Sequence, residues 1–303
     1  MAEHTELREV HLDRVPSLGS LYAQALGRMA QTVMAGRPPT TLPAVRYAAD
    51  GVRADADQLA GYQQLLGEPG TDALPAGYVH VMAFPVAVAV MARVDFPLPL
   101  LGMVHLANVV EQRAPIHLGE TVDVRAWAEN LRPHRVGTQV DLVTEVSRDG
   151  EVRWRGVSTY LAKGRKLAGA DATQGTEGSE HTERSEVALP PVAGRWKLGA
   201  DIGRRYAAVS GDRNPIHLSG LSAKLFGFPR AIAHGMYTAS RALATVGVAR
   251  GEAFRWSVEF GKPVLLPGAV TFGLAPAAGG GHRYAGWDAK SGKTYFSGSI
   301  TPL

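Results

Sequence analysis

The amino-acid sequence contains no cysteine, and it has neither long charge runs nor a long apolar segment. The absence of cysteine excludes disulfide bonds, thiolate catalysis and cysteine metal sites, and it favours a reducing compartment. Lysines and arginines are scattered and the formal net charge is +4, so nothing indicates a nucleic-acid surface. The first residues, MAEHTELREVHLDRVPSLG, lack the apolar core of a secretory signal. We therefore expect a cytoplasmic protein that does not bind nucleic acid.

The longest apolar stretch is YVHVMAFPVAVAVMA at residues 78–92. It is shorter than the roughly 20 apolar residues that a membrane span needs, and Arg93 and Asp95 follow it. Its apolar residues lie all round a helix, a pattern typical of a helix enclosed by other structure. Pro85 suits the first turn of such a helix. We expect a buried helix here and no membrane span.

The chain contains two diverged copies of one unit. Its 303 residues are enough for two domains of roughly 100 to 200 residues each. A single ungapped register pairs Tyr62 with Tyr206, Gly67 with Gly211, Glu68 with Asp212, Ala73 with His217 and Phe84 with Phe228. Because the order of these matches is consistent along the chain, we expect the same fold to occur twice.

Composition divides the chain into four segments. Residues 164–188 are rich in Gly, Ser, Thr and Glu, which is typical of a flexible linker. Residues 1–40 carry apolar side chains at helical spacing, and we expect an extra helix packed on the surface. The residues on its apolar stripe are Leu21, Leu26, Met29 and Val33. The two copies then occupy residues 41–163 and 189–303.

Each copy reads as helices followed by a run of antiparallel strands. In the second copy a long helix begins near Gly235 and ends near Ala249, and strands follow at residues 254–262, 268–275, 282–289 and 293–301. The first copy shows the same alternation of apolar and polar residues at 122–131, 138–149 and 151–162. This order predicts an α+β fold in which the sheet curls round the long helix.

The segment SGDRNPIH, residues 210–217, concentrates groups that can transfer protons. Unperturbed histidine titrates near 6.5 and aspartate near 3.9, so Asp212 and His217 together can supply a proton donor and a proton acceptor. Pro215 biases Asn214 towards extended backbone, and a rigid, kinked loop can point both reactive side chains at one water molecule. An aspartate near a histidine is often only turn chemistry, so the wider sequence must decide.

Residues 206–236, YAAVSGDRNPIHLSGLSAKLFGFPRAIAHGM, closely resemble the hydratase-2 signature of the MaoC-like dehydratases, the (R)-specific enoyl-thioester hydratases. The resemblance implies a double hotdog, with two antiparallel sheets each wrapped around a long central helix. Residues 41–163 would form a degenerate hotdog and residues 189–303 the catalytic one. The first copy has Ala73 opposite His217, so we expect it to be catalytically silent.

The resemblance also assigns roles to four residues. Asp212 and His217 would be the catalytic dyad, and Asn214 would help to orient it at the substrate. Gly235 would offer its backbone N–H, at the positive end of the central helix, to the thioester carbonyl. We expect His234 to make a structural hydrogen bond where that helix begins. We expect no metal and no cofactor, and we interpret His80, His105 and His117 as scattered core or surface histidines.

The implied activity is the reversible conversion of an (R)-3-hydroxyacyl thioester into a trans-2-enoyl thioester and water, with acyl-CoA or acyl carrier protein as the carrier. Two alternatives are a hotdog thioesterase and a non-catalytic acyl-binding subunit. A serine that lines the acyl pocket in certain hydratases aligns here with Leu243, with Ser240 as the nearest alternative, so the acyl chain length stays open. A monomer and a homodimer of double hotdogs both fit.

Overall fold

The structure is a computed structural model that describes residues 7–31, 39–166 and 189–303. Most of the expected linker therefore lies outside the described residues. The first part of the chain forms β1 (Arg8–His11), α1 (Leu18–Gln31), β2 (Val45–Arg53), α2 (Ala56–Leu66), α3 (Ala76–Met91), β3 (Val104–Gln112), β4 (Thr121–His134), β5 (Gly137–Arg148) and β6 (Glu151–Lys163). The second part forms β7 (Val192–Leu198), α4 (Ile202–Ser210), α5 (Pro215–Leu218), α6 (Gly220–Leu225), α7 (Gly235–Val246), η1 (Gly247–Arg250), β8 (Phe254–Phe260), β9 (Gly268–Pro276), η2 (Ala278–Gly280), β10 (His282–Trp287) and β11 (Thr294–Pro302).

The strands form one 11-stranded sheet in the order β1-β2-β4-β5-β6-β3-β8-β11-β10-β9-β7. Apart from β1, the order reads the same way from both edges towards the middle, since β2, β4, β5, β6 and β3 correspond to β7, β9, β10, β11 and β8. The halves meet where β3 pairs antiparallel with β8, with Val110 opposite Trp256. The fold is thus the expected α+β double hotdog, and its two expected sheets are joined edge to edge into one. The edge strand β1 is an exception to the antiparallel pattern, because it pairs parallel with β2.

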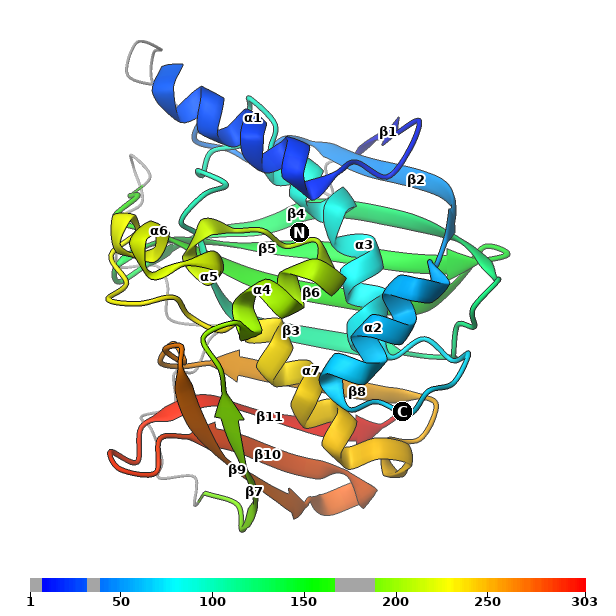
Figure 1. The fold of residues 1–303 in the computed structure, drawn as a ribbon. Helices are drawn as coiled ribbons and strands as arrows, with labels where there is room; N and C mark the ends of the chain where they lie inside the picture. Colours follow the sequence, from blue (N-terminus) through cyan, green and yellow to red (C-terminus); the bar gives the residue numbers. More distant parts are fainter. Residues whose placement is uncertain (1–6, 32–38, 167–188) are drawn as a thin grey trace.

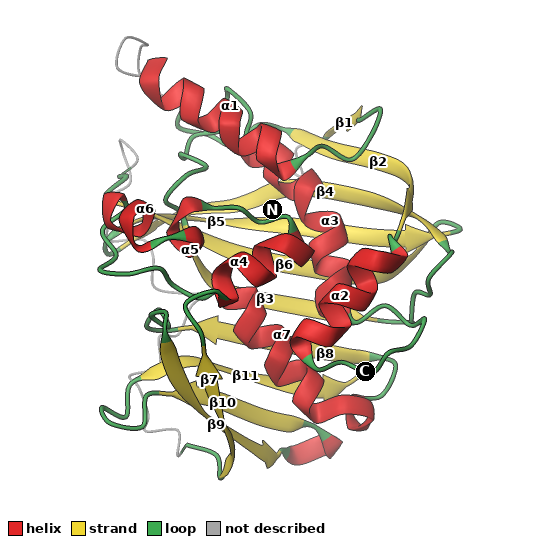
Figure 2. Cartoon of the chain, viewed as in Figure 1, coloured by secondary structure: helices red, strands yellow, loops and turns green. Residues whose placement is uncertain are grey.

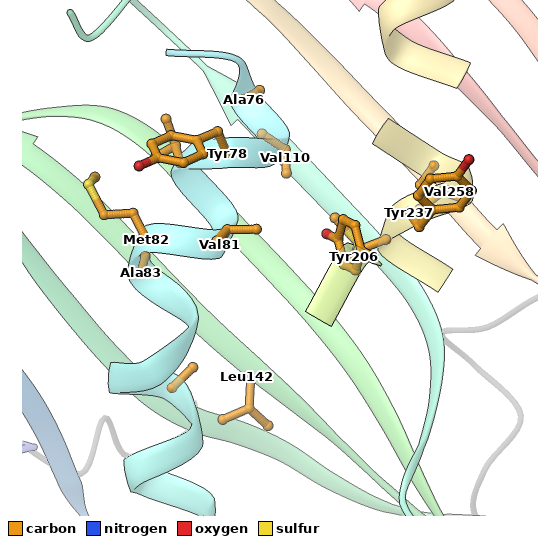
Figure 3. Packing of buried hydrophobic residues seen from close by; sticks show 14 of the residues in the cluster. Ala76, Tyr78, Val81, Met82, Ala83, Val110, Leu142, Tyr206, Tyr237 and Val258 are labelled. Atoms are coloured by element: carbon orange, nitrogen blue, oxygen red, sulfur yellow. The ribbon is translucent and has the colours of Figure 1, made fainter. Parts of the chain in front are cut away.

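The helices α1, α2, α3, α4 and α7 lie on one face of the sheet (Figures 1 and 2). Helices α3 and α7 are the central helices of the two halves, and the residues between them form one continuous core. Aromatic side chains cross the boundary, since Tyr62 of α2 lies 6.5 Å from Tyr206 of α4, measured between ring centroids. Figure 3 shows Tyr206 between α3 and Tyr237 of α7. No helix among the described residues is long and apolar enough to cross a bilayer.

Helix α3 confirms the expected buried helix but corrects the place of Pro85. The helix begins at Ala76, after the N-cap residue Pro75, so Pro85 lies inside it and not in its first turn. A proline there removes one helical hydrogen bond, a cost that is usually about 3 kcal/mol. Nearly every side chain of α3 is buried, and burial of this apolar surface outweighs the local preference.

The ungapped register between the copies also fails after Gly67. The β-bridge between Ala73 and His117 has its counterpart in the bridge between Ile232 and Leu265. Gly67 and Ala73 are six positions apart, whereas Gly211 and Ile232 are twenty-one apart. The second half therefore carries an insertion, and α5 and α6 are formed within it. His217 belongs to this insertion, so Ala73 is not its counterpart, and Phe84 in α3 does not correspond to Phe228 in a loop.

The residue of the first half that corresponds to Asp212 belongs to a buried ion pair. Glu68 follows α2 as Asp212 follows α4, and its carboxylate lies 3.2 Å from the guanidinium of Arg250, which ends η1 of the other half. Only 1% of the Glu68 side chain and 16% of the Arg250 side chain are exposed. Burial raises the pKa of Glu68, and the nearby Arg250 opposes that rise. This pair occupies the place that a second site would need.

Because a buried guanidinium without its counter-charge is costly, Glu68→Gln is expected to lower the free energy of unfolding by about 3 kcal/mol. Chemical denaturation measures this change. Glu145→Gln is the control, because Glu145 faces Arg155 at 3.4 Å in a more exposed pair, and its loss is expected to cost less than about 1 kcal/mol. Equal losses of unfolding free energy in the two variants would contradict the interpretation of Glu68 and Arg250 as a buried ion pair.

Candidate active site

A cavity of about 190 Å³ lies at the junction of the two halves, and both halves line it. Its polar side chains include Tyr22, His80, His105, Asp212, His217 and His234. Its apolar side chains from the first half include Val81, Phe84, Met91, Leu100 and Met103. One cavity thus combines titratable groups with an apolar surface, as in binding sites for small molecules.

The loop that follows α4 is shaped by its own short polar side chains. Gly211 ends α4 with a φ of +72°, a conformation that glycine adopts without strain. Oδ1 of Asp212 then accepts a hydrogen bond from the N–H of Asn214 at 3.1 Å. Asn214 is extended, with φ −55° and ψ 124°, as the following proline favours, and its side chain caps α5. This one-turn helix carries His217, so the local sequence fixes the placement of both reactive side chains.

His217 is held as a neutral imidazole. Its Nδ1 lies 2.9 Å from the backbone carbonyl oxygen of Ile232. Because a carbonyl can only accept, Nδ1 carries the hydrogen and Nε2 presents a lone pair. Burial and, to a smaller extent, the neighbouring His234 lower the pKa of His217 to about 3, against the opposing effects of Asp212 and of the hydrogen bond to Ile232. At neutral pH the side chain is therefore a proton acceptor.

Asp212 is held as a carboxylate. Its Oδ1 accepts a hydrogen bond of 2.8 Å from the hydroxyl of Tyr22, in addition to the one from Asn214. Burial alone would raise the pKa of Asp212, but His234, His217 and these two hydrogen bonds outweigh burial and hold the pKa below its ordinary value. Its Oδ2 lies 3.7 Å from Nε2 of His234.

His234 makes the structural hydrogen bond that the sequence predicts. Its Nε2 donates to the backbone carbonyl oxygen of Asp212 at 3.0 Å. The residue directly precedes α7, and its ring stacks on that of His217 with centroids 3.7 Å apart. His234 therefore ties the start of the central helix to the loop that carries the dyad.

Gly235 is the first residue of α7 and lines the cavity. In this position its N–H has no acceptor within the helix and carries the positive end of the helix dipole. A Cβ at this position would lie between 2.9 and 3.2 Å from three ring atoms of Phe260. A glycine is therefore needed for the packing of Phe260.

Asp212, His217 and His234 offer one ligand atom each within 4.8 Å of one another, which raises the question of a metal ion. The two imidazole rings are stacked at an interplanar angle of 25°. Lone pairs in nearly parallel ring planes do not converge on one ion at about 2 Å. A single water that donates to two acceptors separates them by about 4.5 Å, which is compatible with the upper limit of 4.8 Å on the spacing of these groups. The arrangement suits proton transfer through water better than metal binding.

The structure also brings to the cavity side chains that the sequence did not assign to it, among them two histidines and a tyrosine. His80 and His105, which we interpreted as scattered histidines, line the cavity, and so does Tyr22 of α1. His117 lies elsewhere and faces Asp72 at 3.4 Å. Helix α1 was expected on the surface, and its predicted stripe is wrong at Leu26, which is 50% exposed. These residues come from separate segments, and no sequence spacing connects them.

Comparisons with known proteins agree with this fold and site. Residues 190–275 match the MaoC-like domain family. The chain is 40% identical over 234 residues to 3-hydroxyacyl-thioester dehydratase X of Mycobacterium tuberculosis, covering 77% of this chain and 79% of that protein. The chain therefore belongs to the MaoC-like dehydratases.

Two solved structures share the fold of this chain. The crystal structure of HtdX from Mycobacterium tuberculosis superposes with a TM-score of 0.74 at 34% identity, covering 85% of this chain and 100% of that one. A MaoC-like dehydratase from Phytophthora capsici shares the fold, with a TM-score of 0.63 at 17% identity, over 86% of this chain and 94% of its own.

The buried histidines predict that acid destabilises the protein. Burial lowers the pKa of His80 to about 4 and that of His217 to about 3, whereas histidine in an unfolded chain titrates near 6.5. Between about pH 4 and 6.5 the unfolded chain binds more protons than the folded protein does. The free energy of unfolding therefore falls as the pH falls through this window, by up to about 1.4 kcal/mol per pH unit for each histidine.

The variant His80→Phe is expected to reduce this slope, because Phe84 and Trp154 already surround His80 with aromatic rings. Denaturation at several pH values measures it. A slope equal to that of the wild type would show that His80 is protonated in the folded protein.

Proposed function

We propose that this protein is an (R)-3-hydroxyacyl-thioester dehydratase that also catalyses the reverse reaction, the hydration of a trans-2-enoyl thioester. The observation that carries the proposal is the shared cavity, in which a carboxylate, a neutral imidazole and the N-terminal amide of a central helix face an apolar wall. The relative of this chain in Mycobacterium tuberculosis is named as a 3-hydroxyacyl-thioester dehydratase, which supports the same chemistry.

The dyad would activate one water molecule in the hydration direction. The water would donate hydrogen bonds to Oδ2 of Asp212 and Nε2 of His217 while its oxygen adds to C3. The dyad takes a proton from this water as the C3–O bond forms and electrons move onto the thioester carbonyl. It then delivers a proton to C2 as those electrons return. Water thus supplies both added groups, and dehydration follows the same steps in reverse.

The negative charge that develops on the thioester oxygen needs a donor. The N–H of Gly235 would fill this role, because it starts α7 and lines the cavity. Donors of this kind typically contribute on the order of 100-fold to 1,000-fold in rate. Asn214 would contribute indirectly, through the turn and the cap that hold Asp212 and His217.

The first half would hold the acyl chain. Its central helix and the segment that follows line the cavity with apolar side chains from Val81 to Val104. CoA and acyl carrier protein both remain candidate carriers, and Lys163 and Lys262 line the same cavity. A cationic ammonium group is a suitable partner for an anionic carrier phosphate. A cytoplasmic location remains the prediction from sequence.

Removing either member of the dyad is expected to abolish catalysis. Asp212→Asn and His217→Ala should each lower the rate of crotonyl-CoA hydration by about 1,000-fold or more, because each removes a proton-transfer group. Loss of enoyl absorbance follows the reaction. Asp72→Asn and His117→Ala are matched controls, since these residues form a surface pair outside the cavity. Near wild-type hydration by either dyad variant would refute the proposal. Release of free thiol with enoyl absorbance unchanged would instead indicate a thioesterase.

The first half is expected to contribute no proton-transfer group. Glu68→Gln should therefore leave the turnover of short enoyl thioesters nearly unchanged at temperatures where the variant is folded. A steady-state assay beside a measurement of the folded fraction tests this expectation. A large loss of kcat in fully folded protein would mean that Glu68 takes part in the reaction.

A further inference from the structure

Helix α1 lies outside both repeats and yet reaches the site. Its Tyr22 is 7% exposed, and its hydroxyl donates to Oδ1 of Asp212 at 2.8 Å. Leu18 and Leu21 of the same helix are buried in the shared core. A Cβ placed on Gly211, beside Asp212, would lie 3.4 Å from Cδ1 of Leu18. The helix is therefore packed against the loop that carries the carboxylate.

The two oxygens of Asp212 have different surroundings. Oδ1 accepts from both the Tyr22 hydroxyl and the Asn214 N–H. Oδ2 lies 3.7 Å from Nε2 of His234, beyond hydrogen-bonding distance. From this division we infer that Tyr22 is a positioning residue, which fixes the rotation of the carboxylate and leaves Oδ2 as the oxygen that exchanges the proton. The inference rests on the proposed dehydratase function.

The phenol is suited to this role because it stays protonated. Burial raises the pKa of Tyr22 well above its ordinary value, and the adjacent Asp212 raises it further. The hydroxyl is therefore a neutral donor at neutral pH. In return, its hydrogen bond favours the ionised form of Asp212 and helps to lower the pKa of that carboxyl group.

Other groups also face this carboxylate and share its titration. The titratable side chains that interact with Asp212 from the surrounding elements are Tyr22 of α1, His80 of α3, His105 of β3, Tyr160 of β6, Tyr206 of α4, His217 of α5 and His234 before α7. Among them, Tyr22 is the side chain that donates a hydrogen bond to the carboxylate. Its removal therefore changes one donor and leaves every other titratable group in place.

The test is Tyr22→Phe, which keeps the buried ring and deletes only the hydroxyl. We expect kcat for enoyl-thioester hydration to fall by about 10-fold, in line with the loss of one hydrogen bond to a charged group, with little change in KM. The acid limb of the pH–rate profile should move to higher pH, because Asp212 loses a donor that favours its ionised form. Tyr47→Phe is the matched control, since its hydroxyl meets Arg93 away from the cavity.

Two results would overturn the inference. One is an unchanged rate and pH profile in Tyr22→Phe. The other is a fall in rate that equals the loss of folded protein, as measured by thermal unfolding, while the acid limb of the pH–rate profile stays where it is. That result would mean that Tyr22 contributes only to packing. Failure of the proposed function is separate, because it would show as equal activity in the wild type and in Asp212→Asn, whatever Tyr22→Phe does.

Discussion

The site depends on one buried carboxylate that is kept ionised by donors from separate segments. Asp212 receives a hydrogen bond from the loop that follows it and another from Tyr22, nearly two hundred residues earlier in the chain. Removing a carboxylate from water is costly unless such donors replace the lost hydration. The loop, α1 and the start of α7 must therefore be in place together, and that requirement ties the chemistry to the assembled fold.

The two halves share one scaffold and divide the work between them. Their strands have the same order about the β3–β8 pairing, and their central helices share a core. The insertion after Gly211 gives the second half its α5 and His217. In the first half the corresponding place is closed by the ion pair of Glu68 and Arg250. An asymmetric molecule results, with proton transfer proposed on one side of the cavity and an apolar wall on the other.

Features that short-range interactions determine could be predicted from the sequence, and features that depend on tertiary packing could not. The strands β4, β5 and β6, the strands of the second half, the central helices and the loop that carries Asp212 and His217 depend on alternation, turn residues and caps within a few positions, and these were predicted. Pro85 was misplaced because burial outweighs a local preference. The register between the copies failed because an insertion is invisible to an ungapped comparison. Tyr22, His80 and His105 were missed because tertiary packing alone brings them to Asp212.

A crystal structure with a stable 3-hydroxyacyl-thioester analogue would test the central claim most directly. The account predicts the 3-hydroxyl group between Oδ2 of Asp212 and Nε2 of His217, with the analogue's carbonyl oxygen accepting from the N–H of Gly235 and the acyl chain along the apolar wall of the first half. An analogue bound with its 3-hydroxyl group on Oδ1, or with its acyl chain outside the shared cavity, would contradict it.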